Sequence, residues 1–319
     1  MIDVFVKRKR IEAEGIVSFE LERQDGAPLP PFSAGSHIDV HAPGGFVLQY
    51  SLCNHADQEH SYLIAVLRDP QSRGGSIAMH DLVHEGDKLT ISEPRNMFPL
   101  APNATRSLLM AGGIGVTPLL CMAERLAHSG ADFKMHYCGR SLGRMAFVER
   151  IRASSFAARV QFHIDDGEDC QKLDMASVLA NPDPGTHLYV CGPTGYMEAV
   201  LAAATAAGWS ADRLHREYFA APAQAADAAA DAAFDVKVAS TGATYRVGPD
   251  EKISDVLKQH GIHIEVGCRE GLCGTCLTRV LEGEADHRDL VLSDEERAAN
   301  DQITPCCSRS RSPLLVLDI

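Results

Sequence analysis

The spacing of four cysteines constrains the fold of this chain more than any other feature of its sequence. Cys268, Cys273 and Cys276 follow the pattern C-x4-C-x2-C, and Cys306 comes after 29 intervening residues. Three thiolates on one short loop and a fourth from a distant strand form the plant-type ligand pattern of a 2Fe–2S cluster. Glycines within the loop allow tight folding and direct backbone N–H groups toward sulfur. We therefore expect these four cysteines to be the ligands of a 2Fe–2S cluster.

Three alternatives accompany this interpretation: a structural zinc site, structural cysteines that bind no metal, and Cys307 as the fourth ligand. Structural zinc sites usually combine two C-x2-C-like pairs, and this sequence holds only one half of such a site. Cys307 directly follows Cys306 and competes with it for the role of fourth ligand. Adjacent residues on a strand point to opposite faces, so we expect only one of the two to bind.

The segment Glu265–Cys276 reads EVGCREGLCGTC and closely resembles plant-type ferredoxins. That resemblance implies a β-grasp fold, an α+β architecture, for residues 234–319. Within this range, residues 234–238 and 244–247 are expected to form a hairpin, and residues 253–260 a short helix.

Residues 1–101 consist of short alternating runs separated by turn residues. The strands expected here are residues 4–6, 16–21, 36–40, 46–52, 62–67 and 88–91. One brief helix is expected over residues 77–84, with Ser76 as its cap. Many short strands with a single brief helix predict an antiparallel β-barrel domain.

Strands and helices alternate over residues 102–222, which predicts a doubly wound α/β domain with a parallel sheet. The strands expected are residues 107–111, 133–138, 160–164 and 187–191. An alanine-rich tract follows, and we interpret residues 223–233 as a linker between domains. Because alanine has the highest helix propensity, a helix remains the alternative there.

A glycine-rich turn, Gly112-Gly113-Ile114-Gly115-Val116-Thr117-Pro118, joins a predicted strand to a predicted helix. Such a turn lets a pyrophosphate approach the backbone, and the helix N-terminus supplies N–H donors. Any tight strand–helix turn can use glycine, so the turn alone is weak evidence for a nucleotide site. Cys191-Gly192-Pro193 ends the last predicted strand at the carboxyl edge of the sheet, where open α/β folds bind ligands.

In the first domain, Gln49-Tyr50-Ser51-Leu52 precedes Arg73-Gly74-Gly75-Ser76. A tyrosine ring can lie against a flavin, and glycines before a helix can seat its phosphate. Each motif alone is compatible with ordinary barrel structure. Together they resemble the ferredoxin–NADP reductase superfamily.

The three segments in this order, with the ferredoxin last, resemble the phthalate dioxygenase reductase family over essentially the whole chain. This resemblance implies FMN in the barrel, with FAD as the less favoured flavin, NADH on the α/β domain, and the 2Fe–2S cluster at the C-terminus. The residues that it assigns to the flavin ring are Tyr50, Ser51 and Leu52. Those that it assigns to the flavin phosphate are Gly74, Gly75 and Ser76. The residues that it assigns to the nicotinamide of NADH are Gly113, Thr117, Cys191, Gly192 and Pro193. Those that it assigns to the adenosine half of NADH are Arg140, Ser141 and Asp166. Phe219, in Glu217-Tyr-Phe, resembles an aromatic residue that covers the flavin.

One position departs from the family pattern. The flavin motif of the family usually begins with an arginine two residues before the tyrosine, and this chain has Leu48 there. A bidentate phosphate contact is therefore missing, unless Arg68 or Arg73 replaces it. With this departure, FMN and FAD both remain alternatives for the flavin.

The charge balance limits the classes of partner. The chain holds 30 Lys and Arg against 43 Asp and Glu, a net charge of −13. This acidic balance argues against nucleic acid or an anionic membrane as the main partner. No stretch approaches the roughly 18 apolar residues of a membrane span, and the first residues do not form a signal peptide. We expect a cytoplasmic protein, and a monomer.

These expectations combine into one function. Nicotinamide donates two electrons as hydride, a 2Fe–2S cluster accepts one at a time, and flavin can mediate between them. We expect a reductase that passes electrons from NADH through flavin and cluster to a separate, Rieske-type terminal oxygenase, with Ser51 and Cys191 at the reacting rings. Two alternatives remain: a stand-alone flavin reductase or diaphorase, and a non-enzymatic ferredoxin-type carrier whose flavin site has decayed.

Overall fold

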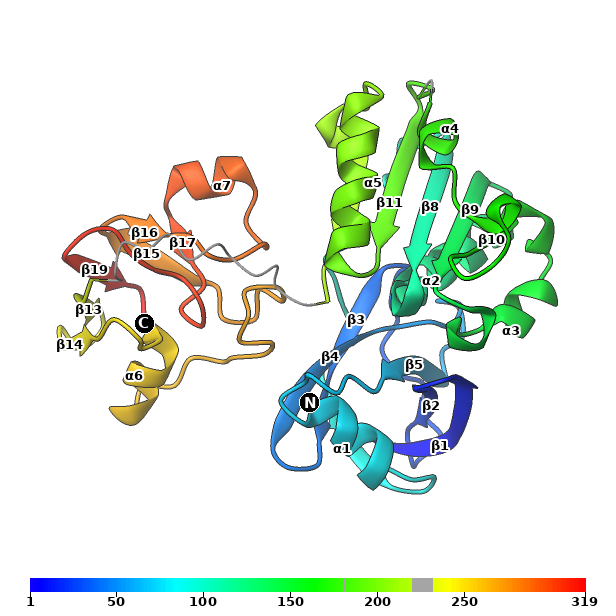
Figure 1. The fold of residues 1–319 in the computed structure, drawn as a ribbon. Helices are drawn as coiled ribbons and strands as arrows, with labels where there is room; N and C mark the ends of the chain where they lie inside the picture. The colour runs from blue at the N-terminus through cyan, green and yellow to red at the C-terminus, as the bar shows by residue number, and fades with distance from the viewer. Residues whose placement is uncertain (181, 220–231) are drawn as a thin grey trace. The chain divides into compact units, whose positions relative to one another are not determined.

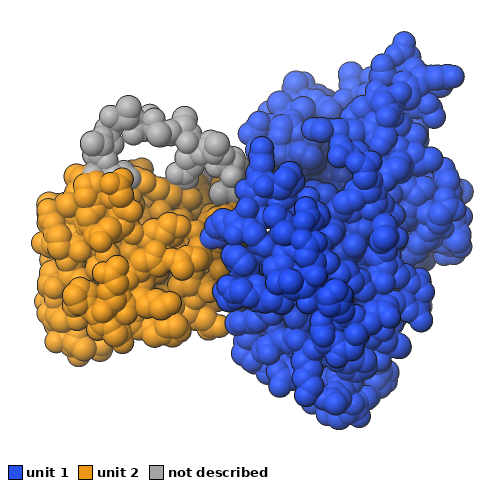
Figure 2. Space-filling model, turned by 60° about the horizontal axis from the view of Figure 1, so that its bottom comes forward, with its two compact units in different colours: residues 1–218 blue, residues 219–319 orange. Residues whose placement is uncertain are grey.

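The computed structural model describes residues 1–180, 182–219 and 232–319, which form two compact units (Figure 1). The first unit comprises residues 1–218 and the second residues 219–319, coloured separately in Figure 2. Most of the predicted linker, at residues 223–231, lies outside the described residues. Each unit is described by itself below.

Within the described part of the first unit, the N-terminal strands form a seven-stranded antiparallel sheet. They are β1 (Ile2–Ala13), β2 (Ile16–Glu22), β3 (Ser36–Ala42), β4 (Phe46–Ser51), β5 (Ser61–Leu67), β6 (Lys88–Ile91) and β7 (Arg95–Asn96). The strand order is β4-β3-β6-β1-β2-β5, with β7 beside β3. Alternate side chains such as Val4, Val6 and Phe19 turn into one buried core, as the alternating sequence predicts. All six predicted strands of this segment are present.

The single α-helix of this segment, α1 (Gly75–Leu82), starts earlier than predicted. Gly74 precedes it in the left-handed region, with φ of 105°, a conformation that glycine adopts without strain. The expectation that Ser76 caps this helix is wrong, because Ser76 lies inside its first turn. The Ser76 hydroxyl instead accepts the Asp69 N–H at 3.2 Å.

The second sheet of the first unit is five-stranded and parallel, in the order β10-β9-β8-β11-β12. Its strands are β8 (Arg106–Gly112), β9 (Asp132–Gly139), β10 (Val160–Ile164), β11 (Thr186–Cys191) and β12 (Leu214–Glu217). The α-helices between them are α2 (Val116–His128), α3 (Val148–Arg152), α4 (Met175–Leu179) and α5 (Thr194–Ala206). Short 3-10 helices are η1 (Gly113–Gly115), η2 (Leu142–Arg144), η3 (Ala157–Arg159), η4 (Asp169–Gln171) and η5 (Ala211–Arg213).

The central strand β8 is buried on both faces. Leu109 and Ala111 pack in one core cluster with α2, and Leu108 and Met110 pack in another with α5. A parallel strand covered by helices on both sides reads as a continuous apolar run, and the segment SLLMA is such a run.

One hydrophobic core joins the two sheets of the first unit. Ile16, Ala65 and Phe98, from the antiparallel segment, belong to the same buried cluster as Leu119 and Leu120 of α2. The two layers are therefore packed against each other through α2.

The second unit is built on a five-stranded sheet among its described residues, in the order β14-β13-β19-β15-β17. Its strands are β13 (Phe234–Val238), β14 (Thr244–Val247), β15 (Thr278–Glu282), β17 (Gln302–Ile303) and β19 (Leu314–Leu317), and β16 (Ala285–Asp286) pairs with β18 (Arg309–Ser310). Helix α6 (Ile253–Gln259) packs Leu257 into a core with Phe234 and Val236. Helix α7 (Asp294–Ala299) precedes β17. The predicted hairpin and short helix are both present.

Along the described residues, no helix is both long enough and apolar enough to cross a membrane.

Candidate active site and cluster loop

The glycine turn lies where the order of the parallel strands reverses. β8 and β11 are neighbours, with Ala111 opposite Cys191, while the chain leaves them toward opposite ends of the sheet. A side chain at Gly115 would place its Cβ 2.2 Å from the Cys191 carbonyl oxygen, so the two loops approach as closely as only glycine allows. Gly113 has a positive φ of 53°, and its Cα faces open space. This is the crevice in which open α/β sheets bind ligands.

Two side chains hold the glycine turn in place. Thr117 is buried, and its hydroxyl donates to the Ile114 carbonyl oxygen at 3.0 Å. The Tyr196 ring packs against Gly112, where a Cβ would lie 2.7 Å from the ring. The glycine motif of the sequence includes Thr117, whereas Tyr196 lies on α5 and belongs to no motif.

A buried polar cluster lies beside this crevice. Ser51 at the end of β4 donates to Glu217 Oε2 at 3.2 Å, and Glu217 at the end of β12 is the register partner of Cys191. His37 on β3 is the cross-strand partner of Ser51, and its Nδ1 lies 4.0 Å from Glu217 Oε1. The site cluster, as we call Ser51, Cys191, Glu217 and His37, therefore joins both sheets of the first unit.

Burial sets the protonation of the site cluster. It raises the pKa of Glu217 to about 8, and the Ser51 hydrogen bond offsets only part of that effect. Burial also lowers the pKa of His37 to about 4 and raises that of Cys191 well above its usual range. Near neutral pH the cluster therefore holds mostly a carboxylic acid, a neutral imidazole and a thiol, with no net charge.

The sequence indicated Ser51 and Cys191 as site residues, but not Glu217 and His37. Strand β12 was not predicted, so the one signal available for Glu217 was that it opens the motif Glu217-Tyr-Phe. His37 gave no such signal, because a histidine in an alternating strand is most often structural.

The other residues assigned to the flavin lie around β4 and α1. Tyr50 is half-buried, and burial raises its pKa. Leu52 is fully buried, and its N–H donates to the Ser36 carbonyl oxygen. The Leu48 side chain lies against Gly75, where a Cβ would be 2.7 Å from Leu48 Cδ2.

The residues assigned to the adenosine half lie after β9 and β10. Arg140 and Asp166 are both exposed, and the Asp166 N–H donates to the Arg140 carbonyl oxygen at 3.0 Å. Ser141 directly follows Arg140 and precedes η2. Gly192 and Pro193, assigned to the nicotinamide, join β11 to α5. Phe219 falls in the second unit and is 42% exposed.

In the ligand loop, residues 268–276 of the second unit, backbone N–H groups point toward the cysteine sulfur atoms. Backbone N–H groups of Glu270 and Leu272 donate to Cys268 Sγ at 3.4 and 3.3 Å, and the Cys268 N–H donates to Cys273 Sγ at 3.4 Å. A hydrogen bond from the Cys268 thiol lowers the pKa of Cys273 to about 5. N–H donors aimed at sulfur stabilise the thiolate form that binds metal.

The thiols fall into two pairs. Cys268 lies beside Cys273, and Cys306 beside Cys276, which raises the pKa of Cys306 to about 12. Across the ranges that the structure describes, no three His, Cys, Asp or Glu side chains gather around a point for one metal ion. Two pairs rather than one group suit a cluster of two irons, each taking two cysteines.

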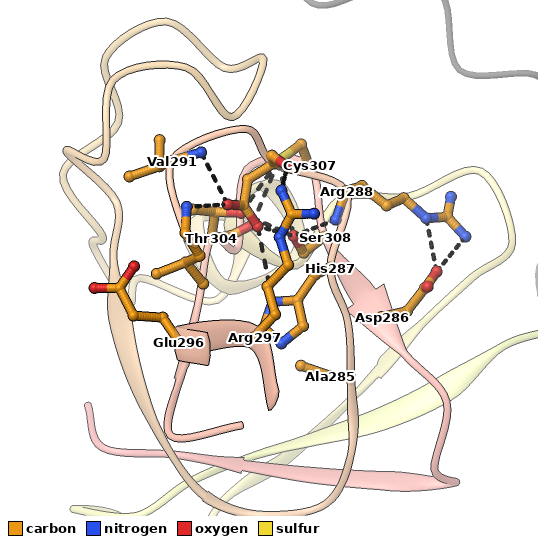
Figure 3. A network of polar contacts seen from close by, with 12 residues as sticks. Ala285, Asp286, His287, Arg288, Val291, Glu296, Arg297, Thr304, Cys307 and Ser308 are labelled. Carbon is orange, nitrogen blue, oxygen red and sulfur yellow. Dashed lines mark hydrogen bonds and ion pairs between the residues drawn. The ribbon is translucent and has the colours of Figure 1, made fainter. Parts of the chain in front are cut away.

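The expectation about Cys306 and Cys307 is wrong in its physical basis. The two residues lie in a turn after β17, not on a strand, so they do not alternate between faces of a sheet. The Thr304 carbonyl oxygen accepts the N–H groups of both Cys307 and Ser308, at 3.1 and 3.0 Å. Figure 3 shows Cys307 beside Thr304 and Ser308.

The chain has similar sequences among known families and proteins. Residues 236–311 match the family model of the 2Fe-2S iron-sulfur cluster binding domain, and residues 92–214 that of the dimethylamine monooxygenase subunit DmmA-like N-terminal domain. The chain is 55% identical to vanillate O-demethylase oxidoreductase of Pseudomonas putida over 320 residues, which cover all of both proteins.

The solved structures that match the whole chain include the following two. One is phthalate dioxygenase reductase, described as a modular structure for electron transfer from pyridine nucleotides to a 2Fe–2S centre, with 37% identity, a TM-score of 0.75 and 98% of that chain covered. The other is an intact type IV self-sufficient cytochrome P450 monooxygenase, with 38% identity and a TM-score of 0.89, of which this chain spans 41%.

Proposed function

Since the chain belongs to the phthalate dioxygenase reductase family, we propose that it is the reductase component of a Rieske-type oxygenase system. It takes electrons from NADH through a flavin to its 2Fe–2S cluster and passes them to a separate oxygenase. The oxygenase we propose is a vanillate O-demethylase, because the Pseudomonas putida relative of that name is 55% identical over its full length.

The observation that carries this proposal is the site cluster at the reversal of the parallel sheet. It places polar groups from β3 and β4 of one sheet beside the ends of β11 and β12 of the other. Two ring systems that exchange a hydride need such a junction, because each ring is held by a different layer.

The residues of the site cluster are chemically suited to hold a flavin. Among the described residues, the buried His37 Nε2 has no hydrogen-bond partner, which leaves one polar atom free for a ligand at the site cluster. When bound, the flavin supplies the step between two-electron and one-electron transfer. Ser51 hydrogen-bonds the ring edge, Tyr50 lies against the ring, and Cys191 packs at the nicotinamide. We assign the phosphate to the N-terminus of α1, with Gly74, Gly75 and Ser76.

We propose FMN rather than FAD, from the family resemblance. Gly113, Thr117, Gly192 and Pro193 hold the nicotinamide end of NADH, and Arg140, Ser141 and Asp166 the adenosine end. The role of Phe219 stays a prediction from the family resemblance.

The cluster is assigned to Cys268, Cys273, Cys276 and Cys306. The two thiol pairs and the N–H groups directed at Cys268 and Cys273 support this ligand set. Each pair would hold one iron.

The finer architecture follows the same proposal. We infer a flavin-binding β-barrel domain at residues 1–101, a doubly wound NAD-binding domain at 102–222, a linker at 223–233 and a β-grasp ferredoxin domain at 234–319. We expect a cytoplasmic monomer, since NADH is supplied in the cytoplasm.

The contact between Leu48 and Gly75 favours one competing function, a ferredoxin-type carrier with a decayed flavin site. The absorption spectrum of anaerobically purified protein, with extraction of its flavin, separates the two. The carrier would show cluster absorption without flavin, and NADH would not bleach it.

The route of electrons is tested with Cys273→Ser. This variant should lose cytochrome c reduction and vanillate turnover with an added oxygenase, while NADH-dependent ferricyanide reduction persists, because the flavin site lies in the other unit. Cys170→Ser, a change of an exposed cysteine, is the control and should behave as wild type. Wild-type protein without iron or acid-labile sulfide would contradict the proposed function.

A further inference from the structure

Two cysteines, not one, face the ligand loop from the turn at residues 304–308. The Thr304 carbonyl oxygen accepts two successive N–H groups, which bends the backbone tightly at Cys306 and Cys307. In an extended strand one of these side chains would point away from the loop. In this turn that constraint is absent.

The turn meets the ligand loop at Gly271. The Cys307 sulfur packs against Gly271, where a Cβ would lie only 2.6 Å from it. Cys306 lies beside Cys276 of the same loop. Gly271 has a positive φ of 74°, a conformation that glycine adopts without strain. Because it has no side chain, it also leaves room for the Cys307 thiol.

Polar groups hold Cys307 in place (Figure 3). Its sulfur lies 3.2 Å from Thr304 Oγ1 and 3.9 Å from Ser308 Oγ. Ser308 Oγ is also 3.5 Å from the buried Asp289 carboxylate, which accepts the N–H groups of Val291 and Leu292 at 3.1 and 2.8 Å. A sulfur surrounded by hydroxyl groups is not packed as an apolar core atom, and it is next to the Cys306 sulfur.

We propose that Cys307 is an interchangeable fourth ligand, able to bind the iron that Cys306 binds; this rests on the cluster assigned above. In the exchange, the iron–sulfur bond to Cys306 breaks and one to Cys307 forms. The proton of the Cys307 thiol moves to the departing Cys306 thiolate. The number of thiolates on the cluster, its charge and its oxidation state are unchanged.

The test compares alanine variants of the full chain by iron, acid-labile sulfide and the electron paramagnetic resonance spectrum of the dithionite-reduced protein. Cys307→Ala should keep the full wild-type iron content. Cys306→Ala should keep at least about half of it, with a shifted spectrum, because the geometry at that iron changes. The double variant should fall about tenfold or more, as should Cys276→Ala, which has no neighbouring replacement thiol on the ligand loop.

A Cys306→Ala variant as empty as the double variant and Cys276→Ala would overturn the proposal while leaving the cluster assignment intact. Cys306→Ser, compared with Cys306→Ser/Cys307→Ala, repeats the test with a side chain of nearly the same size. Equal iron contents in those two serine variants would overturn it as well. Absence of iron and sulfide from wild-type protein would instead refute the proposed function.

Discussion

Ser51 Oγ and Glu217 Oε2 are 3.2 Å apart, although one ends a strand of the antiparallel sheet and the other a strand of the parallel sheet. The bond lies within a site cluster that is uncharged near neutral pH, because burial keeps the Glu217 carboxyl protonated. A buried ionised carboxylate without a cation would be costly. The site therefore holds its proton without a charged partner for Glu217.

Glu217 should make stability fall as pH rises. In the unfolded chain this carboxyl titrates near its ordinary pKa of 4.5, whereas burial raises its pKa in the folded protein to about 8. Its contribution to stability is complete below pH 4.5 and is lost as pH rises through about 8, at no more than about 1.4 kcal/mol per pH unit. Urea unfolding from pH 5 to 9 should show this slope in wild type and a flatter profile in Glu217→Gln. Parallel profiles for the two proteins would contradict the assignment.

Leu48→Arg should tighten FMN binding. The Leu48 side chain lies against Gly75 at the start of α1, so an arginine there would bring a charge to the proposed phosphate seat. Arg68, one candidate for replacing it, already pairs with Asp81 at 2.8 Å. A charged hydrogen bond contributes roughly 1.5–3 kcal/mol, or about tenfold to a hundredfold in the dissociation constant. Fluorescence titration with FMN measures this effect. Leu48→Met, which adds no charge, is the control, and equal affinities for all three proteins would show that this position does not contact the phosphate.

Gly115→Ala should damage both stability and NADH binding. The new Cβ would lie 2.2 Å from the Cys191 carbonyl oxygen, a backbone atom that cannot rotate away. We expect a loss of more than about 2 kcal/mol in unfolding free energy, with weakened NADH binding. Gly143→Ala is the matched control, because no atom lies within 4 Å of its Cβ. A Gly115→Ala protein as stable as this control would show that the two loops separate easily.

Asp166→Ala should reduce the preference for NADH over NADPH. A carboxylate at the end of a parallel strand accepts hydrogen bonds from the ribose hydroxyl of NADH and repels the 2′-phosphate of NADPH. We expect the ratio of kcat/KM values to fall about tenfold, which corresponds to about 1.4 kcal/mol. Asp165→Ala changes an exposed neighbour and should leave the ratio unchanged. A wild-type preference for NADPH would give Arg140 the deciding role instead.

The sequence predicted long-range architecture best where the pattern was strong. The alternating runs of residues 1–101 and the apolar run at Leu108 are both explained by burial, on one face and on two faces respectively. Strand β12 was missed because its four residues, LHRE, contain a single apolar side chain. Without that strand, Glu217 could not be placed beside Cys191.

Residues of the site that depend on distant contacts could not be predicted. Glu217 and Ser51 are 166 positions apart, and the sequence around either residue does not indicate that it contacts the other. The turn at Cys306 and Cys307 was missed for a different reason: the rule applied to it holds only for extended backbone. Gly74 rather than Ser76 is the N-cap of α1, because a glycine with positive φ can precede a helix without a side-chain cap.

The shared core around α2 determines which parts of this protein can be recombined. Ile16, Ala65 and Phe98 lose their apolar neighbours if the parallel sheet is replaced, as do Leu119 and Leu120 if the antiparallel sheet is exchanged. The second unit has a core of its own, built from residues such as Phe234 and Leu257. Chimeric reductases should therefore tolerate a transplanted ferredoxin unit, whereas the two layers that meet at Ser51 and Glu217 must be inherited together.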